Sequence, residues 1–174
     1  MVKTKRLTLT AMLAGIAAAV FAVESQIPPI VPVPGVKLGL ANAVTLFAMA
    51  VLSRREAFLT LAVRIILSCV FSGGMSMFVY SVSGGVLSFA VMCAALKRLG
   101  CDKIWAVSVF GAAAHNVGQL AAACAVTGNA AVMYYLPVLL ISGIITGLFT
   151  GMCTYYILKN KYVKKICAAL AEDR

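Results

Sequence analysis

Acidic residues are scarce in this chain, which has 5 Asp and Glu against 15 Lys and Arg in 174 residues. No aspartate-rich pair occurs among them, so the chain lacks the carboxylates that would hold Mg²⁺ on a diphosphate group. It also has no G-x-x-x-x-G-K-[ST] motif, which excludes ATP hydrolysis in the P-loop manner. We therefore expect no catalysis by this chain on its own.

Metal ligands are equally sparse. The chain has one histidine and six scattered cysteines, with no C-x-x-C pair and no cluster of histidines. A metal site needs converging ligands at close spacing, so neither a metal ion nor a bound cofactor is expected. The cysteines read as small apolar packing residues: Cys69, Cys93, Cys101, Cys124, Cys153 and Cys167.

Charge of either sign is rare as well. Charged residues make up 11% of the chain and hydrophobic residues 63%, whereas a soluble domain carries about 25% charged residues. A net charge of +10 would suggest nucleic-acid binding in a soluble protein. In so apolar a chain it indicates membrane topology instead, with the lipid bilayer and its cytoplasmic leaflet as the partner.

Six apolar segments account for most of the sequence. They predict an all-α integral membrane bundle in a single domain over residues 1–174, followed by a short basic tail at 159–174. Two segments are shorter than the roughly 20 residues that cross a bilayer, and we expect these to be tilted or partly re-entrant. The segments are 7–26, 38–52, 57–72, 77–96, 104–127 and 134–158.

Basic residues alternate between the gaps that separate these segments. Thirteen of the fifteen fall on one side of the predicted bundle, Lys37 alone falls on the other, and Arg64 lies inside the third segment. Because positively charged loops stay in the cytoplasm, this pattern predicts six membrane-spanning helices with both ends cytoplasmic.

Polar residues within the apolar segments are the candidate site. Ionisable groups in a bilayer are costly, so each is a functional hypothesis by default. One interpretation is a polar pocket in the outer half of the membrane that binds an anionic or carboxylate-bearing ligand. The other is structural, with Glu24 paired to Lys37 or Arg64 and the amides bridging helices. The residues are Glu24, Lys37, Asn42, Arg64, His115, Asn116 and Gln119.

Small residues recur at a spacing of four in two segments. The first segment carries Ala14, Ala18 and Ala22, and the sixth carries Gly143, Gly147 and Gly151. Such stripes let another helix approach closely. Either stripe can serve packing inside the bundle, and we expect the first to dock a partner protein and the second to pack against another helix.

Two further segments leave alternatives open. The stretch 27–36 holds four of the five prolines and predicts a rigid extended loop, which is either a lid or a plain connector. The motif Ser83-Gly84-Gly85 interrupts the fourth segment and predicts a kink, a close approach to a ligand, or a helix crossing.

Several motifs together resemble a known family. The runs at 24–28 (ESQIP) and 32–42 (PVPGVKLGLAN), with shorter matches at 83–92, 111–119, 135–137 and 146–147, resemble the bacterial Gx transporter family. Sequences of that family are also labelled heptaprenyl diphosphate synthase component I. The size and helix count are similar to the S components of energy-coupling factor transporters.

The resemblance to S components implies a function. Such a subunit captures a small nutrient from outside the bacterial cell membrane and docks, through small residues of its first helix, onto a T subunit driven by two ATPases. ATP would then be used by the partner chains. The family's other label implies an alternative, a non-catalytic membrane subunit of a polyprenyl diphosphate synthase in isoprenoid or quinone biosynthesis.

Overall fold

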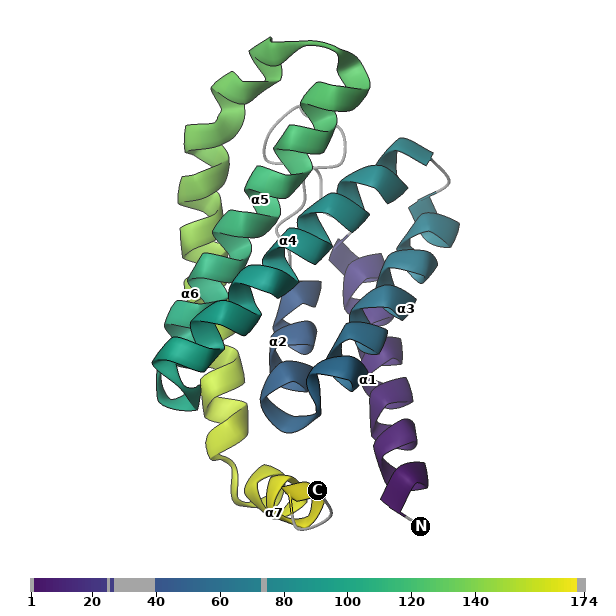
Figure 1. The fold of residues 1–174 in the computed structure, drawn as a ribbon, viewed down its shortest axis with the longest axis vertical. Coiled ribbons are helices and arrows are strands. Elements are labelled where there is room, and N and C mark those ends of the chain that lie inside the picture. The colour runs from purple at the N-terminus through teal and green to yellow at the C-terminus, as the bar shows by residue number, and fades with distance from the viewer. Residues whose placement is uncertain (1, 25, 27–39, 73–74, 172–174) are drawn as a thin grey trace.

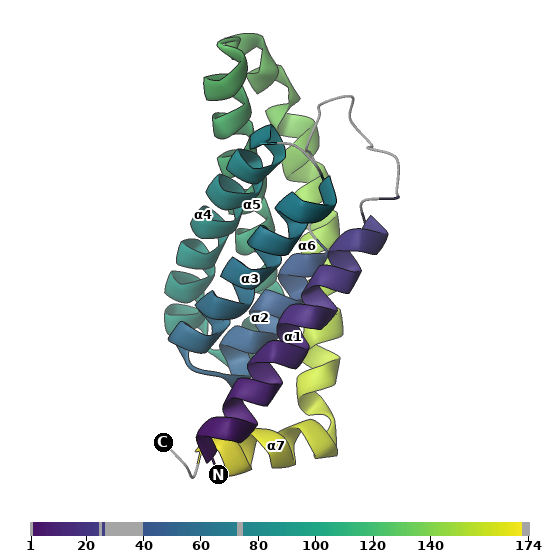
Figure 2. The same cartoon turned by 90° about the vertical axis from the view of Figure 1, so that its right-hand side faces the viewer.

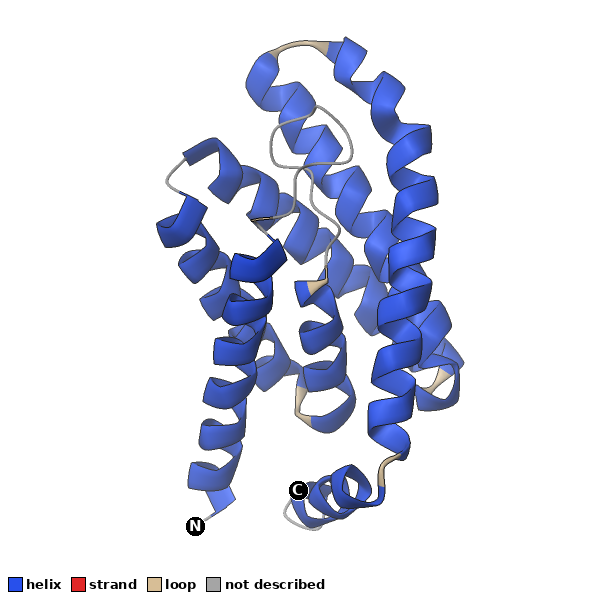
Figure 3. Cartoon of the chain, turned by 180° about the vertical axis from the view of Figure 1, so that it is seen from behind, coloured by secondary structure: helices blue, strands red, loops and turns tan. Residues whose placement is uncertain are grey.

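The computed structural model describes residues 2–24, 26, 40–72 and 75–171, and these residues form helices joined by short turns, with no strand among them (Figures 1 and 3). The prediction of an all-helical protein is thus confirmed. The elements are α1 (Val2–Glu24), α2 (Ala41–Val51), α3 (Arg54–Ser72), α4 (Met75–Leu99), η1 (Cys101–Lys103), α5 (Ile104–Thr127), η2 (Ala130–Tyr135), α6 (Leu136–Lys159) and α7 (Lys161–Ala171).

Each of the six predicted segments corresponds to one of α1 to α6, with differences at the ends. The fifth segment has the bounds of α5, which Gly128 ends in a left-handed conformation at φ 64°. The second is shorter than expected, since α2 has 11 residues. The tail contains a helix of its own, α7, and the proline-rich stretch 27–36 lies outside the described residues.

Four helical segments of the described chain are long and apolar enough to cross a membrane: Thr4–Glu24, Met75–Leu99, Cys101–Thr127 and Ala130–Lys159. The other two candidates fall short for different reasons. Helix α2 is apolar but spans only about 16 Å at 1.5 Å per residue, half of a bilayer core. Helix α3 is long enough but carries Arg54, Arg55, Glu56 and Arg64. The six-span count therefore stays a prediction.

Helix α2 lies in the middle of the bundle. It contacts α1, α3, α4, α5 and α6, and the first view shows it between the α1–α3 pair and the α4–α5–α6 group (Figure 1). Its apolar face belongs to a hydrophobic core cluster formed by residues of five helices. In this cluster Leu46 and Met49 pack with Leu13, Ala57 and Met92. A short helix can hold this place because all of its neighbours shield its backbone.

The side chains are distributed as in a membrane protein, because large apolar groups are exposed on the bundle surface while several polar groups are buried. Large apolar side chains on α6 are exposed, Ile141, Ile145 and Phe149 among them. Charged and amide side chains, including Glu24 and Arg64, are buried. A water-facing surface would reverse this arrangement, whereas lipid favours it. The chain is a helical membrane protein by this distribution and by its four long apolar helices.

The basic residues gather toward one end of the bundle. The starts of α1 and α3, the end of α4, η1, the end of α6 and the whole of α7 lie toward the same end (Figures 1 and 2). These positions carry Lys5, Arg6, Arg54, Arg55, Lys97, Arg98, Lys103 and Lys159. The alternation seen in the sequence thus becomes a single basic end.

Glycines bring α5 and α6 together. A Cβ added to Gly147 would lie 2.9 Å from the Val109 Cα, and one added to Gly151 would lie 2.7 Å from the Trp105 Cα. Gly143 faces the side-chain amide of Asn116. These contacts leave no room for side chains, so the stripe on α6 packs against its neighbour in the chain.

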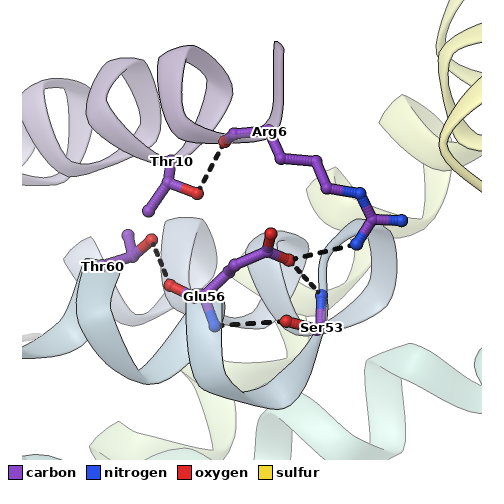
Figure 4. Close-up of polar contacts among 5 residues, drawn as sticks. All are labelled: Arg6, Thr10, Ser53, Glu56 and Thr60. Atoms are coloured by element: carbon purple, nitrogen blue, oxygen red, sulfur yellow. Dashed lines mark hydrogen bonds and ion pairs between the residues drawn. The ribbon is translucent and has the colours of Figure 1, made fainter. Parts of the chain in front are cut away.

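A polar corner joins α1 to α3 at the basic end (Figure 4). Ser53 and Glu56 form a capping box at the start of α3: the Ser53 N–H donates to Glu56 Oε2 at 2.8 Å, and the Glu56 N–H donates to Ser53 Oγ at 3.4 Å. The same Glu56 oxygen lies 3.6 Å from Arg6 Nη1 on α1. One carboxylate therefore starts α3 and ties it to α1.

We expect Ser53→Ala to destabilise the protein by about 1 kcal/mol, because the substitution removes the hydroxyl that accepts from the Glu56 N–H. Thermal unfolding of the detergent-purified protein measures the loss. Thr8→Ala is the matched control, since the Thr8 hydroxyl bonds only the Thr4 carbonyl of its own helix at an exposed position. Equal losses in the two variants would contradict the capping role.

Candidate functional site

Helix α4 crosses between α3 and α5 at a place where it has no side chains. Gly84 faces α5, where an added Cβ would lie 2.9 Å from the His115 carbonyl oxygen. Gly85 faces α3, where a Cβ would lie 3.1 Å from Ile65 Cδ1. On α5, Gly118 meets the Ser83 carbonyl in the same way. The glycine pair is thus a helix crossing, one of the alternatives for this motif, and it lets α3 and α5 approach each other.

Arg64 lies in the middle of α3, about 15 Å along the helix from Arg54. It is buried, and its Nη1 donates a hydrogen bond of 2.6 Å to Oδ1 of Asn42, near the start of α2. The negative charge of Glu24, the last residue of α1, also acts on it. Three helices thus contribute to the surroundings of one buried cation.

His115 brings α5 to the same place. Its ring lies against the Gly84 backbone, where an added Cβ would be 3.0 Å from His115 Cε1, and the charge of Arg64 acts on it. We call Glu24, Asn42, Arg64 and His115 the central polar cluster. In the described part of the chain, each of its members is less than a tenth exposed.

Polar atoms of this cluster remain available to a ligand. Among the described residues, Asn42 Nδ2, Arg64 Nε and His115 Nδ1 are buried with no hydrogen-bond partner. Because Asn42 Oδ1 accepts from Arg64, the free atom of the amide is its donor. A buried donor without a partner is costly, so such atoms mark a site that a ligand can complete. The Nε–H of the Arg64 guanidinium and the Nδ2–H of the Asn42 amide are donors that suit an anionic oxygen.

The remaining predicted residues lie in different places. Asn116 points toward α6, where its Nδ2 donates to the Leu139 carbonyl at 2.6 Å. Gln119 is buried with its side chain packed on Gly84, one helical turn from His115. Lys37 lies outside the described residues. The structure thus brings four of the seven together, places Gln119 beside His115 on the same glycine, and gives Asn116 a bridging position between α5 and α6.

Sequence reasoning missed two polar side chains at this level of the bundle. Thr45, three residues after Asn42 on the same face of α2, has a buried hydroxyl with no partner among the described residues. The same holds for Ser88 on α4, one turn beyond Gly84. Hydroxyls in helices often bond a carbonyl of their own helix, so polarity alone marked neither as a site residue, although Ser88 lies in the family-like run 83–92.

The small-residue stripe of α1 faces inward. Ala14 and Ala18 are buried within the bundle, and Ala22 is partly buried. The exposed small residues of α1 are Ala11, Gly15 and Ala19, which form a second stripe at the same spacing. An apolar groove of about 260 Å³ runs beside this helix, between α1, α2 and α6, and is lined by Leu13, Ile16, Ala43, Val44, Phe47, Cys153, Thr154 and Ile157.

Metal ligands do not converge anywhere in the residues that the structure describes, since no three His, Cys, Asp or Glu side chains come together. The six cysteines are free thiols, and four of them are partly buried. Nothing in the arrangement of these side chains forms a ligand set for a metal ion.

We expect Gly118→Ala to destabilise the protein by about 1–3 kcal/mol, because overpacking at a tight contact forces backbone shifts. The new Cβ would lie 2.8 Å from the Ser83 carbonyl oxygen and 3.0 Å from the Gly84 Cα, and backbone atoms cannot swing aside. Gly15→Ala on α1 is the control, since nothing lies within 4 Å of a Cβ there. Thermal unfolding in detergent separates the two, and an unchanged midpoint for Gly118→Ala would contradict the close crossing.

Comparison with known proteins identifies the family of the chain. A family model described as heptaprenyl diphosphate synthase component I matches residues 13–157, which include all four members of the central polar cluster. No curated protein and no solved structure matches. The resemblance indicated by the sequence motifs is confirmed. The chain belongs to the heptaprenyl diphosphate synthase component I family.

Proposed function

We propose that this protein is the membrane-embedded substrate-binding subunit of a small-solute uptake transporter, similar to the S components of energy-coupling factor transporters. The observation that carries the proposal is the central polar cluster, in which a buried arginine, a histidine and an amide from three helices keep unpartnered nitrogen atoms. Packing alone gives no reason to bury such atoms unsatisfied, whereas a ligand that accepts their hydrogen bonds does.

The proposed orientation follows from the basic end. Because positively charged loops stay in the cytoplasm, the end that carries Arg54, Arg55, Lys97 and Arg98 faces the cytoplasm. In a six-helix bundle in the bacterial plasma membrane, both termini then lie on that side as well. The central polar cluster then lies in the outer half of the bundle. Asn42 is near the start of α2 and Glu24 is the last residue of α1, and both of these helix ends point away from the basic end. The solute reaches the cluster from outside.

The proposed ligand is anionic and bears a carboxylate. Arg64 and Glu24 balance each other, and Lys37, five residues before Asn42 in the sequence, supplies a further positive charge. The Arg64 Nε–H and the Asn42 amide donate to the ligand's oxygens, and His115 Nδ1 makes a third contact. Asn116 and Gln119 support the site from α5.

Energy for transport comes from other chains in this proposal. The chain has no P-loop motif, and in this proposal a T subunit and ATPases supply the energy. The small-residue surface of α1 is the proposed docking region. Of its two stripes, Ala14, Ala18 and Ala22 support the helix from within, and the exposed Ala11, Gly15 and Ala19 meet the partner helix.

A second candidate function is favoured by the family's description. A component of a heptaprenyl diphosphate synthase would be a non-catalytic membrane subunit that recruits a soluble catalytic partner or holds an isoprenoid chain. The apolar groove between α1, α2 and α6 is the feature that would suit such a chain.

We expect Arg64→Met and His115→Ala each to lower retention of the co-purified solute, and its uptake by cells, by roughly 10-fold or more. Hydrogen bonds to charged groups contribute about 1.5–3 kcal/mol. Mass spectrometry of the detergent-purified protein measures retention. Thr150→Ala is the control, because its hydroxyl pairs with Ser108 between α5 and α6, away from the cluster. Unchanged retention and uptake in both cluster variants would refute the site.

Affinity purification in mild detergent distinguishes the two functions. The transporter predicts a T subunit with two ATPases and a bound polar metabolite. The synthase subunit predicts a soluble, aspartate-rich prenyl synthase and a bound isoprenoid. Recovery of the second set would overturn the transporter proposal.

A further inference from the structure

Helix α7 is set crosswise to the end of α6 by a single capping residue. Asn160 ends α6 in an extended conformation, and its Oδ1 accepts from the Tyr162 N–H at 2.9 Å, which caps the start of α7. Its carbonyl accepts from the Lys164 N–H at 3.0 Å. The second view shows α7 lying across the basic end of the bundle, from beneath α6 toward the start of α1 (Figure 2).

This corner fixes the level of α7 relative to the membrane. The long apolar segment Ala130–Lys159 ends one residue before Asn160. Lys159 already turns back, with its Nζ 4.5 Å from the centre of the Tyr155 ring. A helix that starts directly after such a segment and runs crosswise to it lies at the surface of the bilayer, neither in its core nor free in water.

The residues of α7 divide into two faces. Lys161, Lys164 and Lys165 fall on one side of the helix, while Tyr162 and Ile166 fall on the other. All five are exposed, Tyr162 by 78% and Ile166 by 49%. The helix has no acidic residue between Lys161 and Ala171. An exposed apolar face beside a purely basic one is typical of helices that lie in the headgroup region.

Among its described residues, α7 has only a narrow face that the rest of the protein partly covers. Val163 and Cys167 are partly buried, and burial raises the pKa of the Cys167 thiol, as does the nearby Cys101 of η1. The contact of α7 with α6 holds the helix at the end of the bundle. It leaves the apolar side chains of Tyr162 and Ile166 uncovered within the described structure.

We propose that α7 is an interfacial helix that binds anionic phospholipid headgroups, with Tyr162 and Ile166 inserted among the lipid chains and Lys161, Lys164 and Lys165 at the phosphates. Charge selects the occupant, because three lysines with no counter-charge on the helix complement an anionic leaflet. A free peptide of 11 residues would scarcely be helical. Tethering to α6 makes the binding intramolecular, so even a short helix stays at the surface.

The test places a fluorescent reporter on the apolar face. The full-length protein carries Trp105→Phe, which removes its one tryptophan, and Tyr162→Trp. It is reconstituted into phosphatidylcholine vesicles that contain increasing fractions of lipid brominated in the acyl chains, either phosphatidylglycerol or phosphatidylcholine. Bromine quenches an indole only at short range, so quenching reports insertion and the dose reports lipid preference.

We expect quenching by both lipids, with phosphatidylglycerol effective at a several-fold lower fraction. A lysine near an anionic surface favours binding by roughly fivefold. The triple change Lys161→Gln, Lys164→Gln and Lys165→Gln should therefore abolish the preference. The control removes three charges elsewhere at the same end, with Lys97→Gln, Arg98→Gln and Lys103→Gln, and should keep it.

Three results would overturn the proposal. An indole that neither lipid quenches would place α7 in water or on protein. Equal quenching by the two lipids would show insertion without anion recognition. A loss of preference in the control variant as large as in the α7 variant would assign the effect to the net charge of the bundle end.

Discussion

The side-chain-free crossing of α4 with its neighbours is the constraint on which the rest of the site depends. Gly84 and Gly85 present backbone to α5 and α3 on two sides, and Gly118 presents backbone in return. The close packing of α4 on both neighbours accompanies the arrangement in which Arg64 on α3 and His115 on α5 belong to one cluster. A methyl group at Gly84 would lie 2.7 Å from Gln119 Cγ and 2.9 Å from the His115 carbonyl oxygen, so the crossing has no room for a side chain.

The crossing matters because the cluster it assembles is expensive. A buried arginine in a membrane protein is tolerated where partners compensate it, and here the partners come from α1 and α2. The compensation is incomplete, since nitrogen atoms of Arg64, Asn42 and His115 have no hydrogen-bond partner among the described residues. Helix α2 also supplies Leu46 to the apolar core, whose burial offsets the cost of the unpartnered polar atoms.

The sequence predicted the helices well because the signals are local. The apolar run that follows Lys103 and stops at Gly128 gave α5 its bounds, and the cost of ionisable groups in lipid pointed to Arg64 and His115. It could not say which face of a helix meets which neighbour. Adjacent residues on a helix point about 100° apart, so His115 joins the cluster while Asn116 bonds α6.

Other features escaped for the same reason. Two small-residue stripes on α1 look alike in the sequence, and only packing decides that Ala14 is buried while Gly15 is exposed. The tail predicts only a short basic segment, because 11 residues are too few for a helix signal without the packing that places α7. The S-x-x-E spacing at Ser53 lies in a basic turn, and only the structure shows that it forms a capping box.

The tight turn between α2 and α3 has a mechanical consequence. Only Leu52 and Ser53 separate the two helices, and the capping box fixes the start of the second. Asn42 and Arg64 thus sit on the two arms of one rigid hairpin, and their hydrogen bond survives any movement of the hairpin as a body. Glu24 and His115 belong to helices outside it. If the hairpin slides within the bundle, the distances from Arg64 to Glu24 and His115 change, while the distance from Arg64 to Asn42 stays the same. The geometry of the cluster therefore depends on how the hairpin sits between α1 and α5.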